Sequence, residues 1–207
     1  MSAETPNLGW KKALQNPSFK QKLLVSIFCI VVIMIFFPFF FQYIEQRKGV
    51  LLNDVLLAHL PAVDVSIPIF AIIWGTGLFT TIRGIQHPTI VITFFWSFIL
   101  LSITRIATIL LFPLEAPAEI IPLADPISNA VYGGKFITKD LFYSGHTATQ
   151  FLMYLCLQKK LDKTITLIST FLIGGMVLLQ HVHYTIDVLA APIITFFCFK
   201  MAQKIIQ

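Results

Sequence analysis

Charged residues are scarce in this sequence. Asp, Glu, Lys and Arg make up 12% of the 207 residues, whereas hydrophobic residues make up 57%. A soluble domain of this length needs more charged side chains to keep its surface solvated. The shortage of charge therefore excludes an ordinary soluble domain and indicates an integral membrane protein, with residues 1–207 forming a single domain.

Cysteine and the common phosphate-binding patterns are scarce or absent as well. The three cysteines, Cys29, Cys156 and Cys198, each lie within an apolar run. An odd number of cysteines without motif spacing predicts neither a disulfide framework nor a zinc site. No Gly-rich phosphate loop is present. We expect no cleaved signal peptide, because the first apolar run is too long and no small-residue cleavage site follows it.

Long apolar runs are abundant, and about 20 such residues suffice to cross a bilayer. They predict an all-α membrane protein with six transmembrane helices. The approximate spans are 23–41, 65–82, 89–112, 144–160, 163–180 and 183–200. The stretch 51–60 mixes polar residues with leucines, which predicts an outer-side amphipathic helix in the interface between the first two spans. Residues 113–143 are rich in Pro, Gly and Asp and predict a loop.

The basic residues predict the orientation. The net charge of +5 comes from short Lys and Arg clusters between apolar runs, a pattern that orients inserted helices and does not indicate nucleic-acid binding. These clusters predict that both termini are cytoplasmic, because ten basic residues then fall on the cytoplasmic side and four on the outer side. The four are Arg47, Lys48, Lys135 and Lys139.

Three ionisable residues gather near the outer side of this topology. His146 opens the fourth span, and His183 and Asp187 open the sixth. The i, i+4 spacing of His183 and Asp187 predicts that they share a helix face, so Asp187 orients the ring and leaves its other nitrogen nucleophilic. Solvation at the interface is the alternative for His146 alone, and a metal site is a weaker alternative for all three. Ionisable groups within spans are costly, which favours a functional site.

Arg105 lies inside the third span, where its charge requires an anionic partner. That partner is either an Asp side chain or a lipid phosphate. His181 faces another direction from His183 and would support the site only indirectly, and Asp140 is a polar group that would line an entrance. The neighbours of the two histidines, Tyr143, Ser144 and Tyr184, are candidates for the same supporting or entrance roles.

Two motifs resemble a known family. Residues 142–147, Phe-Tyr-Ser-Gly-His-Thr, and residues 181–188, His-Val-His-Tyr-Thr-Ile-Asp-Val, resemble the PAP2-like lipid phosphatase and phosphotransferase superfamily. Within it, the sequence is most similar to the sphingomyelin synthase branch, over roughly 96–195. The resemblance implies that His183 is the nucleophile on phosphorus and Asp187 its orienter. It implies that His146 acts as general acid and then base, and that no metal or other cofactor is needed.

The departures from that family suggest the substrate. Lipid phosphatases carry an Arg six residues before the second His, where this chain has Val177, and their Lys and Arg-Pro motif is absent. The loss of these cations favours a phosphodiester with one negative charge, which Arg105 would bind.

The resulting hypothesis is a phosphotransferase. It would move a phospholipid headgroup onto a lipid alcohol such as ceramide through a phosphohistidine, releasing diacylglycerol. The alternatives are a lipid phosphate phosphatase or phospholipase C-like hydrolase with the same triad, and a non-enzymatic transporter or scaffold. The expected partners are the two lipids within the bilayer, and the expected location is a bacterial cytoplasmic membrane. The headgroup, the acceptor and any homo-oligomer stay open.

Overall fold

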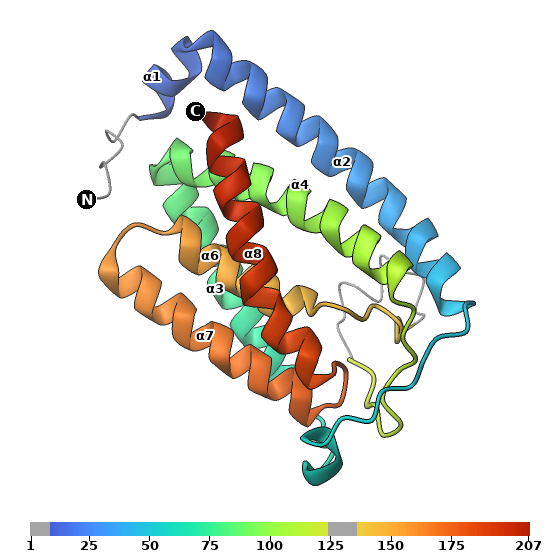
Figure 1. Ribbon diagram of the computed structural model, residues 1–207. Coiled ribbons are helices and arrows are strands. Elements are labelled where there is room, and N and C mark those ends of the chain that lie inside the picture. Colours follow the sequence, from blue (N-terminus) through green and yellow to red (C-terminus); the bar gives the residue numbers. More distant parts are fainter. Residues whose placement is uncertain (1–8, 124–135) are drawn as a thin grey trace.

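The computed structural model describes residues 9–123 and 136–207 (Figure 1). In this part of the chain the regular structure is helical, apart from one isolated bridge between Val50 and Leu114. The helices are α1 (Trp10–Gln15), α2 (Pro17–Glu45), the 3-10 helix η1 (Leu57–His59), α3 (Ser66–Gln86), α4 (Pro88–Leu111), α6 (Gly145–Cys156), α7 (Lys160–Leu179) and α8 (Thr185–Ile206). The predicted all-α class is confirmed for the described residues. Lys135, which entered the charge count, lies outside them.

Within residues 9–123 and 136–207, five helices are long and apolar enough to cross a membrane, namely α2, α3, α4, α7 and α8. The helix that corresponds to the predicted fourth span, α6, has only 12 residues. That is about 18 Å of helix, whereas the hydrocarbon core is about 30 Å thick. The predicted fourth span, 144–160, is therefore too long. Five of the six expected spans have helices of sufficient length. The fourth expected span is not confirmed.

The shortness of α6 follows from the chain on either side of it. Ser144 caps its N-terminus by accepting a hydrogen bond from the Thr147 amide, and the helix ends at Leu157 in extended backbone. Before Ser144, residues 136–141 are irregular, yet Leu141 and Tyr143 are buried. Non-helical backbone at membrane depth is stable only where protein encloses it. Leu141, Tyr143 and Ser144, directly before α6, are enclosed in this way.

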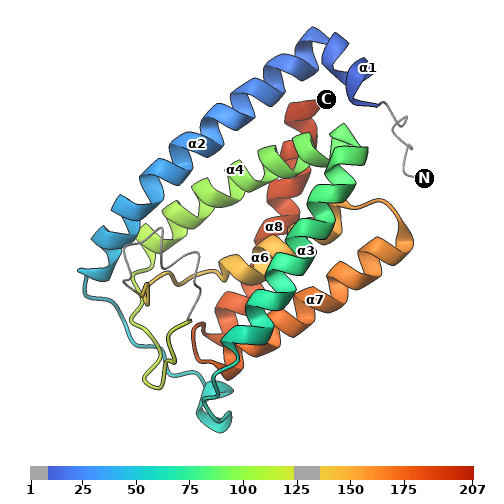
Figure 2. The same cartoon turned by 180° about the vertical axis from the view of Figure 1, so that it is seen from behind.

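Helix α2 lies along α4, whereas α4, α6, α7 and α8 pack into a bundle with α3 (Figures 1 and 2). Phe40, Phe41 and Ile44 of α2 pack against Ile109 of α4. The other faces of α2 carry exposed apolar side chains, among them Phe28 and Phe39 at 69% and 68% exposed. A soluble surface rarely exposes such a continuous apolar area, so this face is suited to contact lipid.

The helix ends form two groups. One group, here called the site end because it contains His183, comprises segments 46–65, 112–123 and 180–184 (Figure 1). The opposite group, here called the basic end, comprises segments 9–16 and 157–159 and residue 87. At the basic end, the Trp10 indole donates to the Ile85 carbonyl at 2.8 Å, and Arg83 forms an ion pair with Asp162 at 2.7 Å. The basic residues at or near this end are Lys11, Lys12, Lys20, Lys22, Arg83, Lys159, Lys160, Lys163, Lys200 and Lys204.

The amphipathic helix expected over 51–60 is not confirmed, because this stretch holds only the three residues of η1. Asp54 explains the local structure. Its carboxylate accepts from the amides of Leu56 and Leu57 and from the amide and hydroxyl of Thr185, at 2.6–3.2 Å. An Asp that bonds nearby backbone amides competes with continued helix. The segment is thereby fastened to the first residue of α8.

We expect Asp54→Ala to destabilise the protein by about 1 kcal/mol, as loss of a helix cap does. Burial alone would raise the pKa of Asp54, but the bonds from Thr185, Leu57 and Leu56 outweigh it and lower the pKa below its usual 3.8. The carboxylate therefore stabilises the fold above the unfolded-state pKa and loses this effect as pH falls through the folded-state pKa.

Thermal unfolding in detergent at several pH values measures this effect. The difference between wild type and Asp54→Ala should be constant near neutral pH and vanish at low pH, below the folded-state pKa. A difference that does not change with pH would contradict the assignment.

Candidate active site

The C-terminus of α7 places the second histidine motif. The helix ends in a Schellman arrangement, in which the His181 amide donates to the Leu178 carbonyl and the Val182 amide to the Val177 carbonyl. His181 has the left-handed φ of 54° that this arrangement requires, a role usually taken by glycine. The reversal of the chain after His181 places His183 immediately before α8.

His183 and Asp187 are paired, but not as two residues on one helix face. His183 precedes the N-cap of α8, Tyr184. Its Nδ1–H donates to the Asp187 carboxylate at 3.2 Å, and the Tyr184 amide donates to the same oxygen at 3.1 Å. The pairing expected from i, i+4 spacing is therefore present, while its expected helical geometry is wrong. Asp187 therefore has two roles: it caps the N-terminus of α8, and it orients the imidazole of His183.

The N-terminus of α6 is fastened to the same turn of α8. The Ser144 amide donates to the Asp187 backbone carbonyl at 3.1 Å, and Asp187 is fully buried. His146, in the first turn of α6, then lies beside His183, with 6.4 Å between the ring centroids. Two histidines from motifs 37 residues apart in sequence thus face a common space.

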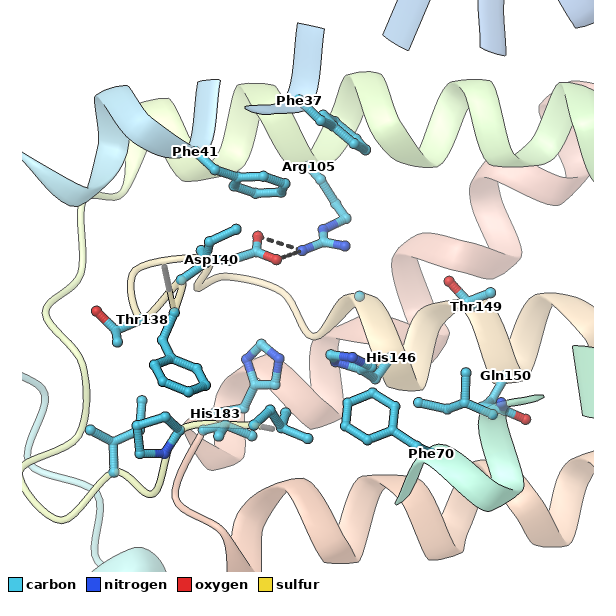
Figure 3. A pocket seen from close by; sticks show the side chains of 18 of the residues that line it. Phe37, Phe41, Phe70, Arg105, Thr138, Asp140, His146, Thr149, Gln150 and His183 are labelled. Atoms are coloured by element: carbon cyan, nitrogen blue, oxygen red, sulfur yellow. Dashed lines mark hydrogen bonds and ion pairs between the residues drawn. The ribbon is translucent and has the colours of Figure 1, made fainter. Parts of the chain in front are cut away.

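Arg105 projects from α4 toward the same space. Its guanidinium binds both carboxylate oxygens of Asp140 (Figure 3), and it lies directly over Gly145, the first residue of α6. A Cβ on Gly145 would come within 1.7 Å of the Arg105 Nη1 atom. Because α4 ends at Leu111, six residues on, Arg105 lies about 9 Å along the helix from that end. Of its two predicted partners, the structure shows the Asp side chain.

These groups line one cavity of about 350 Å³. Arg105, Asp140, His146 and His183 are the ionisable side chains among its described lining residues. The rest of the wall is mostly apolar and aromatic and comes from α2, α3, α4 and the loop before α6. It includes Met34, Phe37, Phe41, Phe70, Ile73 and Phe98. The size and the few converging polar groups are typical of a small-molecule site.

The other predicted site residues lie outside the lining. The Tyr143 hydroxyl donates to the Leu101 carbonyl at 3.1 Å, and the Tyr184 hydroxyl donates to the Glu115 carbonyl at 2.9 Å. Ser144 acts as the α6 cap. His181 Nε2 donates to the Leu60 carbonyl at 3.1 Å. These four side chains hold segments together around the cavity, whereas Asp140 lines it.

His181 and His183 should therefore respond differently to substitution. We expect His181→Gly to keep catalytic activity within a few-fold of wild type. Glycine removes the strain of positive φ, which offsets the loss of the bond to Leu60. His183→Gly should be inactive. Lipid turnover by both purified variants measures this, and a loss of activity in His181→Gly with unchanged thermal stability would show that His181 takes part in the reaction.

Gln150 is a lining residue that the sequence did not single out. It lies four residues after His146, on the same face of α6, and is 1% exposed. A polar amide within a predicted membrane span was a usable signal, because buried amides require partners. Its partner, Thr76 on α3, had no such signal in the sequence.

Within the described residues, no three His, Cys, Asp or Glu side chains gather as a metal ion would require. The arrangement instead suits proton transfer and attack on phosphorus. One imidazole is oriented by a buried carboxylate, a second imidazole is nearby, and a guanidinium is close to both. Together with the five apolar helices, this site defines a multi-pass membrane protein with a two-histidine centre suited to phosphoryl transfer.

Comparison with known proteins supports this class. Residues 139–205 match the family model of the PAP2 superfamily C-terminal domain. This region contains Asp140, His146, His183 and Asp187, and it excludes Arg105. The match covers less than half of the chain and supports the PAP2-like lipid phosphatase and phosphotransferase superfamily. No curated protein matches the sequence.

Proposed function

We propose that this protein is a phosphotransferase of the sphingomyelin synthase type. It would move the headgroup of a glycerophospholipid onto a lipid alcohol such as ceramide and release diacylglycerol. The observation that carries the proposal is the sharing of one cavity by His146, His183 and Arg105, within a bundle of apolar helices. The PAP2-type match over 139–205 supports phosphoryl chemistry at these histidines.

The pairing of His183 supports its role as nucleophile. Because Nδ1 donates to Asp187, the unprotonated nitrogen of the neutral ring is Nε2, which would attack phosphorus. The bond between phosphorus and the glycerol oxygen breaks, and protonated His146 gives its proton to that oxygen, so diacylglycerol leaves neutral. In the second half, His146 takes the proton of the acceptor hydroxyl. The acceptor oxygen then displaces the His183 nitrogen from phosphorus.

The charges of the cavity favour a phosphodiester. Asp140 neutralises Arg105 through the two-oxygen contact, so protonated His146 supplies the remaining positive charge among the described lining residues. Because Asp187 adds a buried carboxylate beside His183, this site of low dielectric accommodates a phosphodiester with one negative charge more readily than a phosphomonoester dianion. This argument uses the side chains only, and no metal or cofactor enters the proposed steps.

The wall of the cavity supports lipid substrates. Met34 of α2 lines the cavity and is 47% exposed on the helix surface, so the cavity is bounded by a side chain that also faces outward. In Figure 3, Phe70 of α3 lies on the side of His146 opposite Phe37 and Phe41 of α2. Apolar walls that reach the lipid-facing surface suit substrates whose chains remain in the bilayer while the phosphate reaches the histidines.

The test is turnover of a phospholipid labelled in its headgroup phosphate by the purified protein in vesicles, with and without ceramide. The proposal expects the label to appear on ceramide. Release of water-soluble phosphorylated headgroup would instead identify a phospholipase C-like hydrolase, and inorganic phosphate from phosphatidic acid would identify a phosphatase. His59→Ala is a matched control, because His59 is an exposed histidine that bonds its own turn and lies outside the cavity lining.

We further propose that the site end faces away from the cytoplasm, in a bacterial cytoplasmic membrane, with both termini inside. The basic end supports this orientation through the excess of Lys and Arg there. In a variant without native cysteines, Cys at position 48 should react with a membrane-impermeant thiol reagent on intact cells, and Cys at position 204 only after lysis. The reverse labelling would invert the topology.

A further inference from the structure

Gln150 places a hydrogen-bonding group deep in the apolar part of the cavity. It lines the cavity and is 1% exposed, and Figure 3 shows it beyond His146, further along α6. Four residues separate it from His146, which is about 6 Å of helix. The direction is away from the site end, where phospholipid headgroups would lie, and toward the middle of the membrane.

The contacts of Gln150 leave part of its amide unused. Thr76 Oγ1 lies 2.7 Å from the carbonyl of Ile72 on its own helix, so its one proton is donated there. Thr76 therefore accepts from Gln150 Nε2 at 2.9 Å. Among the residues that the structure describes, Thr76 is the hydrogen-bond partner found for this side chain. The Gln150 oxygen lies 3.1 Å from the same Thr76 hydroxyl, so one hydrogen of the amide group remains to serve the cavity.

A buried amide with one donor hydrogen unused costs free energy unless a ligand accepts from it. In a glycerophospholipid, the glycerol carbons separate the phosphate from the ester carbonyls, a spacing comparable to one helical turn of about 5.4 Å. The ester carbonyls also lie on the membrane-centre side of the phosphate. A phosphate beside His146 and His183 would therefore bring a carbonyl close to Gln150.

We propose that Gln150, anchored by Thr76, recognises the carbonyl at the base of a lipid acyl chain by donating its second amide hydrogen. This inference rests on the proposed function, because it assumes a lipid phosphate at the two histidines. In a two-step transfer the same site receives both lipids in turn. Gln150 would then contact the ester carbonyl of the donor and afterwards the amide carbonyl of an acceptor such as ceramide.

The test compares diester with diether phospholipid donors in wild type and in Gln150→Met, which keeps length and removes hydrogen bonding. Wild type should lose about tenfold in kcat/KM with the diether lipid, the size of one hydrogen bond. Gln150→Met should show less than a twofold difference between the lipids. Equal penalties in the two proteins would overturn the proposal and leave Gln150 as a packing residue.

A matched control is available at the basic end. Gln158 donates to Thr89 at 3.5 Å, a second Gln–Thr pair between helices that lies outside this cavity. Gln158→Met should keep the tenfold preference. If Gln150→Met fails to fold, Thr76→Val leaves Gln150 in place without its anchor, and it should reduce the preference. An unchanged preference in a folded Thr76→Val protein would count against the proposal.

A binding measurement separates this inference from the proposed function. Displacement of a fluorescent lipid from His183→Ala protein by diester and diether phospholipids needs no turnover. If wild type neither transfers nor hydrolyses headgroups, the proposed function fails, while a diester preference that Gln150→Met abolishes would still establish carbonyl recognition. Acceptor amides are tested in the same way, by comparing ceramide with its N-alkyl analogue.

Discussion

Replacement of His183 by alanine is expected to abolish turnover, with a loss in kcat of about 10⁶-fold, comparable to removal of a serine nucleophile from a protease. The reason is that every proposed step passes through a bond between phosphorus and His183 Nε2. The effect on stability should be small in comparison, because the Tyr184 amide still donates to Asp187 and caps α8. Turnover of a labelled donor, beside a thermal unfolding curve, separates the two effects.

His146 should behave differently from His183, because it handles protons only. His146→Gln should slow turnover by about 10²–10⁴-fold. With a donor whose leaving group is nitrophenol, no general acid is needed, so phosphorylation of His183 should proceed. The adduct should then persist, since no base activates the acceptor. Mass spectrometry of the trapped protein locates the phosphate, and a phosphate on His146 would reverse the assigned roles.

Asp187→Asn independently tests the proposed orientation of His183 by Asp187. Asparagine can still accept from the Tyr184 amide, but its amide group can turn toward His183 and favour the wrong tautomer. A loss of about 10⁴-fold in kcat is the precedent for such a change in a Ser-His-Asp triad. If Asp187→Asn were nearly as active as wild type, Asp187 would serve the helix cap alone.

The histidine motifs show how much of the site geometry could be predicted from the sequence. It indicated that His183 and Asp187 pair, and the structure confirms the contact. The predicted cause was wrong, because Tyr184 caps α8 and leaves His183 outside the helix. The decisive feature is the chain reversal at His181, which has positive φ. Sequence patterns favour glycine at such a position, so a histidine there gave no signal.

Arg105 and α6 show where local patterns are insufficient. The cost of a charge inside a span required an anionic partner for Arg105, but Asp140 is 35 residues away, in a segment with no periodic pattern. The length of α6 was overestimated for a similar reason. Leu157, which follows Cys156, is buried in the protein core at 2% exposed, and hydropathy alone does not distinguish protein burial from lipid exposure.

Gly145→Ala is expected to disable the site while leaving the fold intact. The new Cβ would meet the Arg105 guanidinium, at 1.7 Å from Nη1 and 2.4 Å from Cζ. Because that group is the far end of a flexible side chain, it moves at little cost in stability. It would leave Asp140 and its place beside the histidines. Loss of one positioned donor to a developing phosphoryl charge lowers kcat by about 10²–10³-fold, and we expect a loss of this size.

The control for Gly145→Ala is a second helical glycine. A Cβ on Gly175 of α7 meets nothing within 4 Å, so Gly175→Ala should keep full activity and raise stability by up to about 1 kcal/mol, as removal of a mid-helix glycine does. Arg105→Gln provides the decisive comparison. If Gly145→Ala acts by displacing the guanidinium, adding it to Arg105→Gln should reduce kcat/KM little further, since the two changes remove the same interaction. Fully multiplicative losses in the double variant would show that Gly145 serves the reaction by a route independent of Arg105.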